Sequence, residues 1–248
     1  MLTITSRDNP QIKAVCALSA SGKRRREEEL FVCEGFTLLD EALRSGLAPR
    51  QVFCVQGQEK RLPPLVCPVA LVTGSVLQQL SDVPAPQGVV FTLPIPKEPE
   101  TLCGTRFLAL DDLRDPGNLG TILRTADAFG LDGVILLGDC ADPYSPKVVR
   151  AAMGSLFRAK LFHRSPQTLR EAMERLDLPL YAAALDADSR PVTGLDLHRA
   201  CVVVGNEAHG VSAAVKDLCR GSVIIPIQSA ESLNAGVAAG ILMWEMSR

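Results

Sequence analysis

Three polar side chains recur at a spacing of three residues within one stretch of the chain, Leu108 to Gly130, and could act on a common substrate. Asn118 supplies an amide, Thr121 a hydroxyl and Arg124 a guanidinium. In an α-helix this spacing keeps the three side chains off the face that the apolar residues bury. The stretch is therefore a candidate site and not only a connection between two elements.

The elements that position these side chains can be predicted from the same stretch. The apolar run 107–110 predicts a strand, and Asp115-Pro116-Gly117 predicts the turn that ends it. The helix predicted from Asn118 has its buried stripe at the i, i+3, i+4 and i+7 positions, which are Leu119, Ile122, Leu123 and Ala126. Gly130 stands where the C-cap of this helix belongs. A strand thus leads directly into the helix that carries the candidate residues.

Two later stretches also place polar residues where a predicted strand ends. In VVVGNEAHGVS, residues 202–212, Gly205 ends the strand and Glu207 follows it. In residues 223–246 the strand stops at Pro226, and a long helix is predicted from about Ser232, with a buried stripe of Leu233, Val237, Ile241 and Trp244. Ligands of parallel α/β sheets bind outside the carboxyl ends of the strands. The three stretches therefore predict one site at one edge of a sheet.

The chain as a whole alternates predicted strands and helices, which favours an α/β protein with parallel strands covered on both faces. The N-terminal strands are predicted at 30–35, 50–55, 68–73 and 88–93. The C-terminal strands are predicted near 106–111, 133–137, 179–185, 201–205 and 222–227, with helices near 118–129, 145–157, 167–176, 211–219 and 232–246. A proline-rich segment, PIPKEPE, separates the two halves. We therefore predict a domain at 1–94, a linker at 95–102 and a second domain at 103–248.

The composition is that of an ordinary globular protein, and its charge is unevenly placed. The 248 residues are 47% hydrophobic and carry a net charge of −2, so the overall charge does not indicate binding to nucleic acid. Basic side chains are concentrated near the N-terminus, where a contact with a polyanion is expected from Arg7, Lys23, Arg24, Arg25 and Arg26. Because Glu27, Glu28 and Glu29 follow directly, the basic run could equally be a solvated helix face with i, i+4 pairs.

Several functional classes are disfavoured by missing motifs. The eight cysteines form no C-x-x-C pair and lie mostly in apolar runs, which favours buried thiols over zinc ligands or disulfides. The three histidines are scattered, so no metal site is expected. No G-x-G-x-x-G follows any strand, which argues against a nicotinamide-dependent oxidoreductase, and no G-x-x-x-x-G-K-[ST] appears, which excludes the common nucleotide-triphosphate loop. With no signal peptide and no long apolar run, we expect a cytoplasmic protein without a membrane partner.

The three stretches together resemble the motifs of the SpoU/TrmH branch of the SPOUT RNA methyltransferases. The resembling segments, in the order of that family, are DPGNLGTILRTADAFG, VVGNEAHGVS and IPIQSAESLNAGVAAGI, with YSPKVVRAAMGSLF at 144–157 between the first two. The N-terminal block TSRDNPQIKAV with LFVCEGFTLLDEAL resembles the small substrate-binding domain of the family, which has a ribosomal-protein-like α/β fold. The resemblance covers almost the whole chain.

This resemblance implies a fold, a reaction and a set of residues. It implies a C-terminal catalytic domain with a deep trefoil knot, which general topology rules would not predict. It also implies S-adenosylmethionine as cofactor, a homodimer through the C-terminal domains, and 2′-O-methylation of a ribose in RNA, with ribosomal RNA as the expected substrate. The catalytic residues implied by motif are Asn118, Arg124, Glu207, Ser232 and Asn234, and the cofactor-binding residues are Val204, Gly205, Ile225, Ile227 and Leu233.

The roles of these residues follow from their chemistry once the reaction is assumed. An arginine has a pKa of about 12.5–13.8 and is a poor base, so Arg124 is expected to fix a phosphate and stabilise a forming alkoxide. Asn118 would orient the ribose or the arginine, and Glu207 would hold that arginine or a partner subunit's. Ser232 and Asn234 would form hydrogen bonds near the methyl donor or the substrate.

Other interpretations remain open at the level of sequence. Each site residue has a structural alternative, which is helix capping for Ser232 and Asn118 and an ion pair for Arg124 and Glu207. The nearest functional alternatives are a tRNA 2′-O-methyltransferase and a catalytically silent, knotted RNA-binding protein. The joint occurrence of the five residues in three matching loops favours the enzyme.

Overall fold

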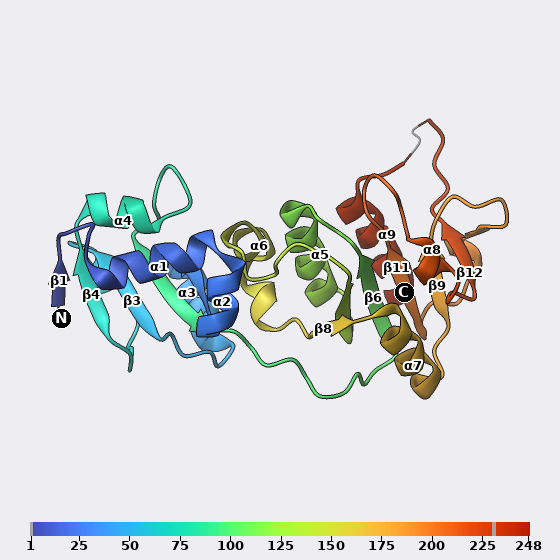
Figure 1. Ribbon diagram of the computed structural model, residues 1–248, viewed down its shortest axis with the longest axis horizontal. Coiled ribbons are helices and arrows are strands. Elements are labelled where there is room, and N and C mark those ends of the chain that lie inside the picture. Colours follow the sequence, from blue (N-terminus) through green and yellow to red (C-terminus); the bar gives the residue numbers. More distant parts are fainter. Residues whose placement is uncertain (1, 230–231) are drawn as a thin grey trace. The chain divides into compact units, whose positions relative to one another are not determined.

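The computed structural model describes residues 2–229 and 232–248 and consists of two compact units, each built on its own sheet (Figure 1). The N-terminal unit comprises Met1–Pro96 together with Asp142–Phe157, and the C-terminal unit comprises Lys97–Ala141 together with Arg158–Arg248. The chain therefore leaves the N-terminal unit, begins the C-terminal unit, returns for sixteen residues and leaves again.

The N-terminal unit has a five-stranded mixed sheet in the order β1-β4-β3-β5-β2. Its strands are β1 (Leu2–Ile4), β2 (Leu30–Glu34), β3 (Gln51–Val55), β4 (Val69–Val72) and β5 (Val89–Pro94). Its helices are α1 (Pro10–Ala20), α2 (Gly22–Glu28), α3 (Phe36–Arg44) and α4 (Gly74–Leu80), with a 3-10 turn at Glu59–Arg61. The predicted start of α1 is confirmed, because Asn9 accepts a hydrogen bond from the Gln11 amide and Pro10 opens the helix.

The returning segment Asp142–Phe157 differs from its predicted place in the C-terminal domain. It forms α6 (Pro146–Ala152) and a 3-10 helix (Met153–Phe157), which contact β2 and α3 of the N-terminal unit. The ring of Tyr144 packs on Phe31 with centroids 5.1 Å apart. The single helix predicted at 145–157 is interrupted at Met153, whose φ of 54° lies in the left-handed region.

The C-terminal unit has a seven-stranded, wholly parallel sheet in the order β10-β12-β9-β11-β6-β7-β8, which confirms the predicted α/β fold class. Its strands are β6 (Arg106–Asp111), β7 (Gly133–Leu137), β8 (Leu161–Arg164), β9 (Leu180–Ala183), β10 (Arg190–Pro191), β11 (Ala200–Val204) and β12 (Gly221–Ile224). Its helices are α5 (Pro116–Ala128), α7 (Pro166–Leu176), α8 (Ala213–Lys216) and α9 (Ala235–Ser247), with a 3-10 turn at Val192–Gly194.

The core of the C-terminal unit follows from the alternation of side chains along its central strands. Phe107 and Ala109 of β6 lie in one buried cluster with Leu169 of α7 and Val215 of α8. Successive strand residues point to opposite faces, so the intervening residues of β6 face α9, which packs on β6 and β11 and lies alongside α5 (Figure 1). Because β6, β7 and β11 have buried residues on both faces, the near-continuous apolar runs of the sequence are explained.

The buried face of α9 was predicted wrongly. Val237 and Trp244 are each 52% exposed, whereas the buried residues of the helix are Ala235, Gly236, Ala239, Leu242, Met243 and Met246. The reason is close packing by small residues, since a Cβ on Gly236 would lie 3.5 Å from Cγ2 of Thr121 on α5. Gly and Ala let two helix backbones approach closely, so the larger side chains of α9 are left on the outside.

No helix in the described parts of the chain is long and apolar enough to cross a membrane.

Candidate functional site

The three predicted loops leave the sheet at a common edge, because all strands of the C-terminal unit are parallel. They are 112–115 after β6, 205–212 after β11, and 225–229 with 232–234 after β12. Strand β9 lies between β11 and β12, so the loop that follows it, 184–189, leaves at the same edge. This fourth loop was missed, although the position of the predicted strand 179–185 would have identified it once the strand order was known.

Asn118 joins the first and second loops. Its Nδ2 donates a hydrogen bond to Oε1 of Glu207 at 2.8 Å, and the residue is only 9% exposed. It does not cap its helix, since Asp115 does so by accepting from the Asn118 backbone amide at 2.7 Å. The capping interpretation of Asn118 is therefore wrong, and its side chain is directed to the site.

Asn234 brings the third loop to the same place. Its Oδ1 accepts from the backbone amides of Gly236 at 2.9 Å and Val237 at 3.2 Å, which makes it the N-cap of α9. A Cβ on Gly236 would lie 3.2 Å from Oδ1 of Asn234 and 3.3 Å from Oδ1 of Asn118. The two amide oxygens therefore converge on Gly236. The helix predicted from Ser232 begins three residues later, so the capping interpretation of Ser232 is also wrong.

Arg124 lies on the exposed side of α5, less than two turns after Asn118. It forms no hydrogen bond or ion pair with any other residue in the described ranges, so the ion-pair interpretation gains no support. The hydroxyl of Thr121 donates to the Gly117 carbonyl at 2.9 Å, which is the usual behaviour of a helical threonine. Asn118 and Arg124 therefore remain candidates for chemistry, whereas Thr121 does not.

Gly205 marks a close approach of two backbone segments. A Cβ at this position would lie 2.1 Å from the Gly210 carbonyl carbon and 2.2 Å from the Val211 nitrogen. The chain folds back here because Asn206 and Gly210 exchange backbone hydrogen bonds of 3.0 and 2.8 Å. Among the other predicted cofactor residues, Val204 is buried, whereas Ile225, Ile227 and Leu233 are partly exposed.

The predicted RNA-binding residues of the N-terminal unit fall into two groups. Lys23 and Arg24 are exposed and pair with Glu27 at 3.7 and 3.3 Å, as in the solvated-face interpretation. Arg26 and Arg7 are exposed, and Arg7 donates to the Ser75 carbonyl.

Arg25 is a correction to the prediction, because it is only 5% exposed and serves the interior of the N-terminal unit. Its Nε and Nη2 donate to Oδ2 of Asp142 at 2.9 and 2.7 Å, and its Nη1 donates to the carbonyls of Leu18 and Ser19. A guanidinium with these partners is not available to a phosphate. The basic run thus contains one structural arginine among three exposed basic side chains.

Most of the cysteines are buried or partly buried, and Cys103 is exposed. All eight are free thiols, and Cys33, Cys54 and Cys201 are fully buried. Burial raises the pKa of Cys219 to about 12, so this thiol carries no appreciable thiolate at neutral pH. This agrees with the interpretation of the cysteines as small hydrophobic residues.

One open hollow of about 660 Å³ lies away from the site. It is lined by Arg170 and Met173 of α7, by Leu180 and by Arg220, at the amino ends of β9 and β12. The predicted residues are at the carboxyl ends of the strands, so none of them lines this hollow.

Comparisons with known proteins agree with this geometry. The SpoU rRNA Methylase family matches residues 105–244, and the MRM3-like substrate binding domain matches residues 9–90. An uncharacterized tRNA/rRNA methyltransferase of Synechocystis is 36% identical and covers 99% of this chain and 93% of its own length. The 23S rRNA (guanosine(2553)-2′-O)-methyltransferase RlmP of Bacillus subtilis is 30% identical, with 99% of each chain covered.

Solved structures are similar over nearly the whole chain as well. The AdoMet-bound rRNA methyltransferase from Sinorhizobium meliloti has a TM-score of 0.88 at 30% identity, covering 98% of this chain and 96% of its own. The AdoMet complex of the SpoU methyltransferase AviRb from Streptomyces viridochromogenes has a TM-score of 0.86 at 26% identity, covering 96% and 97%. The family expected from the three motifs is confirmed: the chain belongs to the SpoU rRNA methylase family.

Proposed function

We propose that this protein transfers the methyl group of S-adenosylmethionine to the 2′-hydroxyl of a ribose in ribosomal RNA. Membership in the SpoU rRNA methylase family supports the reaction class, and the name of the B. subtilis relative supports the 2′-O position and the ribosomal substrate. The observation that carries the proposal is the hydrogen bond from Asn118 to Glu207 beside Gly236, which gathers side chains from all three motifs at one edge of the sheet.

The residues present fit the nucleoside part of S-adenosylmethionine. Two relatives of known structure are described as AdoMet-bound. In this chain Gly205 is buried and leaves no space for a side chain, because the backbone of Gly210 and Val211 folds closely against it. Ile225, Ile227 and Leu233 are partly exposed and would contact an apolar adenine ring, while Val204 is buried and would contribute its backbone only. When bound, S-adenosylmethionine supplies a methyl group on a positively charged sulfur.

The chain's own residues would orient the ribose and stabilise its charge. The Arg124 guanidinium stays protonated and would bind a phosphate next to the target nucleotide, and it would stabilise the negative charge that develops on the 2′-oxygen as its proton passes to solvent. Asn118 is held by Glu207, and its Oδ1 would accept a hydrogen bond from the ribose. The Oδ1 of Asn234 is used by the helix, so its amide nitrogen is the group it would offer to a ligand. The exposed Ser232 would add a hydroxyl.

The N-terminal unit is proposed to bind the RNA. Its match to a substrate binding domain covers residues 9–90, which contains α1 and α2. The exposed side chains of Arg26, Lys23, Arg24 and Arg7 would contact phosphates. Arg25 is excluded from this role by its burial.

A homodimer is proposed through the exposed face of α9. Val237 and Trp244 lie seven residues apart, which is two turns, and both are half exposed. Trp244 packs on the ring of Phe129 at the end of α5, with centroids 5.7 Å apart, and this extends the apolar surface. A second copy of the chain would cover this face. A knotted catalytic domain and a cytoplasmic location belong to the same proposal.

The proposal is tested by methyl transfer from labelled S-adenosylmethionine to unmodified total RNA, followed by mapping of alkali-resistant linkages. Label in one ribose of ribosomal RNA is the expected result. Label in transfer RNA would replace the substrate but keep the reaction. Cofactor binding without transfer to naked RNA or to ribosomal particles would indicate a silent RNA-binding protein, and an absence of cofactor binding would overturn the proposal.

A further inference from the structure

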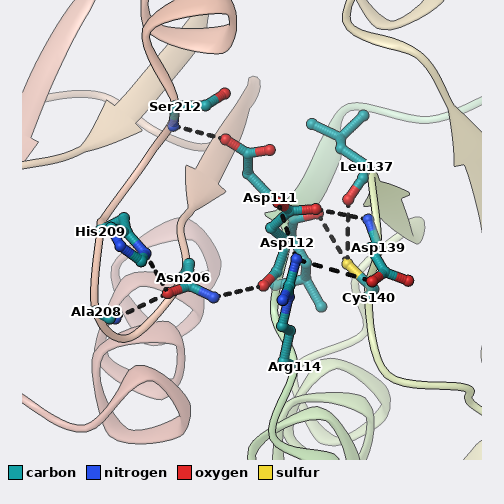
Figure 2. A network of polar contacts seen from close by, with 11 residues as sticks. Asp111, Asp112, Arg114, Leu137, Asp139, Cys140, Asn206, Ala208, His209 and Ser212 are labelled. Atoms are coloured by element: carbon teal, nitrogen blue, oxygen red, sulfur yellow. Dashed lines mark hydrogen bonds and ion pairs between the residues drawn. The ribbon is translucent and has the colours of Figure 1, made fainter.

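Two consecutive residues at the end of β6 hold both ends of the loop 205–212, which carries Glu207 (Figure 2). Near the start of the loop, Nδ2 of Asn206 donates to the Asp112 backbone carbonyl at 2.9 Å. At its end, the Ser212 backbone amide donates to Oδ2 of Asp111 at 2.7 Å. The Asp111 carboxylate is buried, so this hydrogen bond is shielded from water.

Asn206 also determines the shape of the loop itself. Its Oδ1 accepts from the Ala208 backbone amide at 2.9 Å and lies 3.3 Å from Nδ1 of His209 (Figure 2). Its backbone exchanges two hydrogen bonds with Gly210. One side chain thus closes the turn around Glu207 and ties the turn to the neighbouring strand.

The carbonyl that Asn206 binds is itself held in place from the opposite side. Asp112 has a φ of 54°, and its amide donates to the Leu137 carbonyl at 3.1 Å. Its Oδ1 accepts from the Asp139 amide at 2.6 Å (Figure 2). A Cβ on Gly138 would lie 2.2 Å from that oxygen, and the φ of 64° at this position also favours glycine. The anchor for the loop is therefore part of the sheet edge between β6 and β7.

The same strand end leads within a few residues to Asn118. Asp112 is followed by the short turn to Asp115, the N-cap of α5, and Asn118 lies in the first turn of that helix. Both Glu207 and Asn118 are thus attached to the end of β6, one through the loop 205–212 and the other through the start of α5. A loop tied at both ends to this point presents the Glu207 carboxylate to Asn118 without a search through other conformations.

We propose that Asn206 and Asp111 are positioning residues for methyl transfer, which act by holding Glu207 against Asn118. This inference rests on the proposed function and assigns neither residue a contact with the substrate or the cofactor. It differs from a purely structural role, because the effect on the reaction passes through Glu207.

The test uses Asn206→Asp in the full-length protein, with Ser212→Ala as the matched control in the same loop, because the exposed Ser212 side chain does not cap its helix and only its backbone amide binds Asp111. Aspartate keeps the oxygen that accepts from Ala208 but lacks the amide donor that binds the Asp112 carbonyl. We expect kcat for methyl transfer to fall about 10²-fold, the scale of a misplacement of about 1 Å. The affinity for S-adenosylmethionine, measured by calorimetry, should change much less. Ser212→Ala should keep the wild-type kcat.

A double-mutant cycle with Glu207→Ala separates positioning from general destabilisation. If Asn206 acts through Glu207, Asn206→Asp should lower kcat little further once Glu207 is absent. Multiplication of the two effects would overturn the inference, as would a wild-type kcat in Asn206→Asp.

Asp111 gives an independent measurement should Asn206→Asp fail to fold. Asp111→Asn keeps an oxygen acceptor for Ser212 and should retain most of kcat, whereas Asp111→Ala leaves that amide unpaired and should lower it. Equal kcat values in these two variants would overturn the inference. An inactive wild-type protein would instead contradict the proposed function. Failure of the proposed function can therefore be distinguished from failure of the positioning inference.

Discussion

At the scale of single residues, Arg124 differs from Asn118 and Asn234 in having no hydrogen bond or ion pair within the described residues. It is exposed on α5 and has no hydrogen-bond partner within the described residues. Arg124→Ala should therefore leave the melting temperature and the affinity for S-adenosylmethionine unchanged. Methyl transfer should fall by about 10²–10³-fold, as when one charge-stabilising donor is lost. Arg124→Lys, which keeps the charge, should recover part of it. Full activity in the alanine variant would remove Arg124 from the mechanism.

Gly205 offers a second prediction at this scale. Gly205→Ala would place a methyl group on the Gly210 backbone, which cannot move aside as a side chain could. We expect weaker binding of S-adenosylmethionine and a loss of stability of about 1–3 kcal/mol. Gly194→Ala is the matched control, because nothing lies within 4 Å of its added methyl group. Calorimetry and thermal unfolding of both variants test this, and equal behaviour would contradict it.

The sequence predicted which motifs would meet better than it predicted the hydrogen-bond partners of their side chains. The meeting of Asn118, Glu207 and Asn234 was expected from the three motifs. The N-cap role of Asp115 could have been predicted, since it precedes a proline at the first helical position. The burial of Arg25 could not, because Asp142 is 117 residues away in sequence.

At the scale of elements, α9 depends on one side chain for its start. Asn234 satisfies two amides of the first turn, so Asn234→Ala should cost about 1 kcal/mol in the free energy of unfolding. Asn234→Asp keeps the capping oxygen and should restore stability, although it lacks the amide proposed to contact a ligand. Urea denaturation gives the first quantity and kcat the second. Equal unfolding free energies for the alanine variant and wild type would show that the cap is not needed.

Helix α2 carries both exposed basic side chains, proposed to bind RNA, and the buried Arg25, which stabilises the fold. Replacement of Lys23, Arg24 and Arg26 by serine should weaken RNA binding and reduce its salt dependence, because fewer counterions are released. Arg25→Met should leave the salt slope unchanged but lower stability by roughly 1.5–3 kcal/mol, the range for hydrogen bonds to charged groups. Filter binding at several salt concentrations distinguishes them. An unchanged slope in the triple variant would make α2 a solvated face.

The error in α9 has a physical origin in helix packing. Hydrophobic periodicity selected the large residues Val237 and Trp244, but the contact with α5 is made through Gly236, where a backbone can come close. Small residues give little signal in a hydropathy pattern. Strands β8 and β10 were also not predicted, since LFHR is short and partly polar and β10 has only two residues.

At the scale of the whole molecule, the exposed face of α9 predicts the oligomeric state. Trp244→Glu places a charge on a face that a second copy is proposed to bury, and should yield a monomer in light scattering. Val66→Glu is the matched control, because Val66 is fully exposed in the N-terminal unit. A dimer that survives Trp244→Glu unchanged would place the interface elsewhere.

The division into domains was predictable only in part. The proline-rich segment does lie near the first passage between the units, at Pro96–Lys97. The return of Asp142–Phe157 to the N-terminal unit depends on long-range contacts, such as those of Tyr144 with Phe31, that no local pattern encodes.

This return has a consequence for the order of events during synthesis. Translation delivers residues 1–96 first, but the N-terminal unit lacks Asp142 and α6 until residue 157 has left the ribosome. In the interval Arg25 has no carboxylate partner, and β6, α5 and β7 of the other unit have already emerged. The N-terminal unit therefore cannot complete its fold until part of the C-terminal unit has been synthesised. Domains usually fold one after another along a nascent chain. Folding of the N-terminal unit is thus completed only while the C-terminal unit is being synthesised.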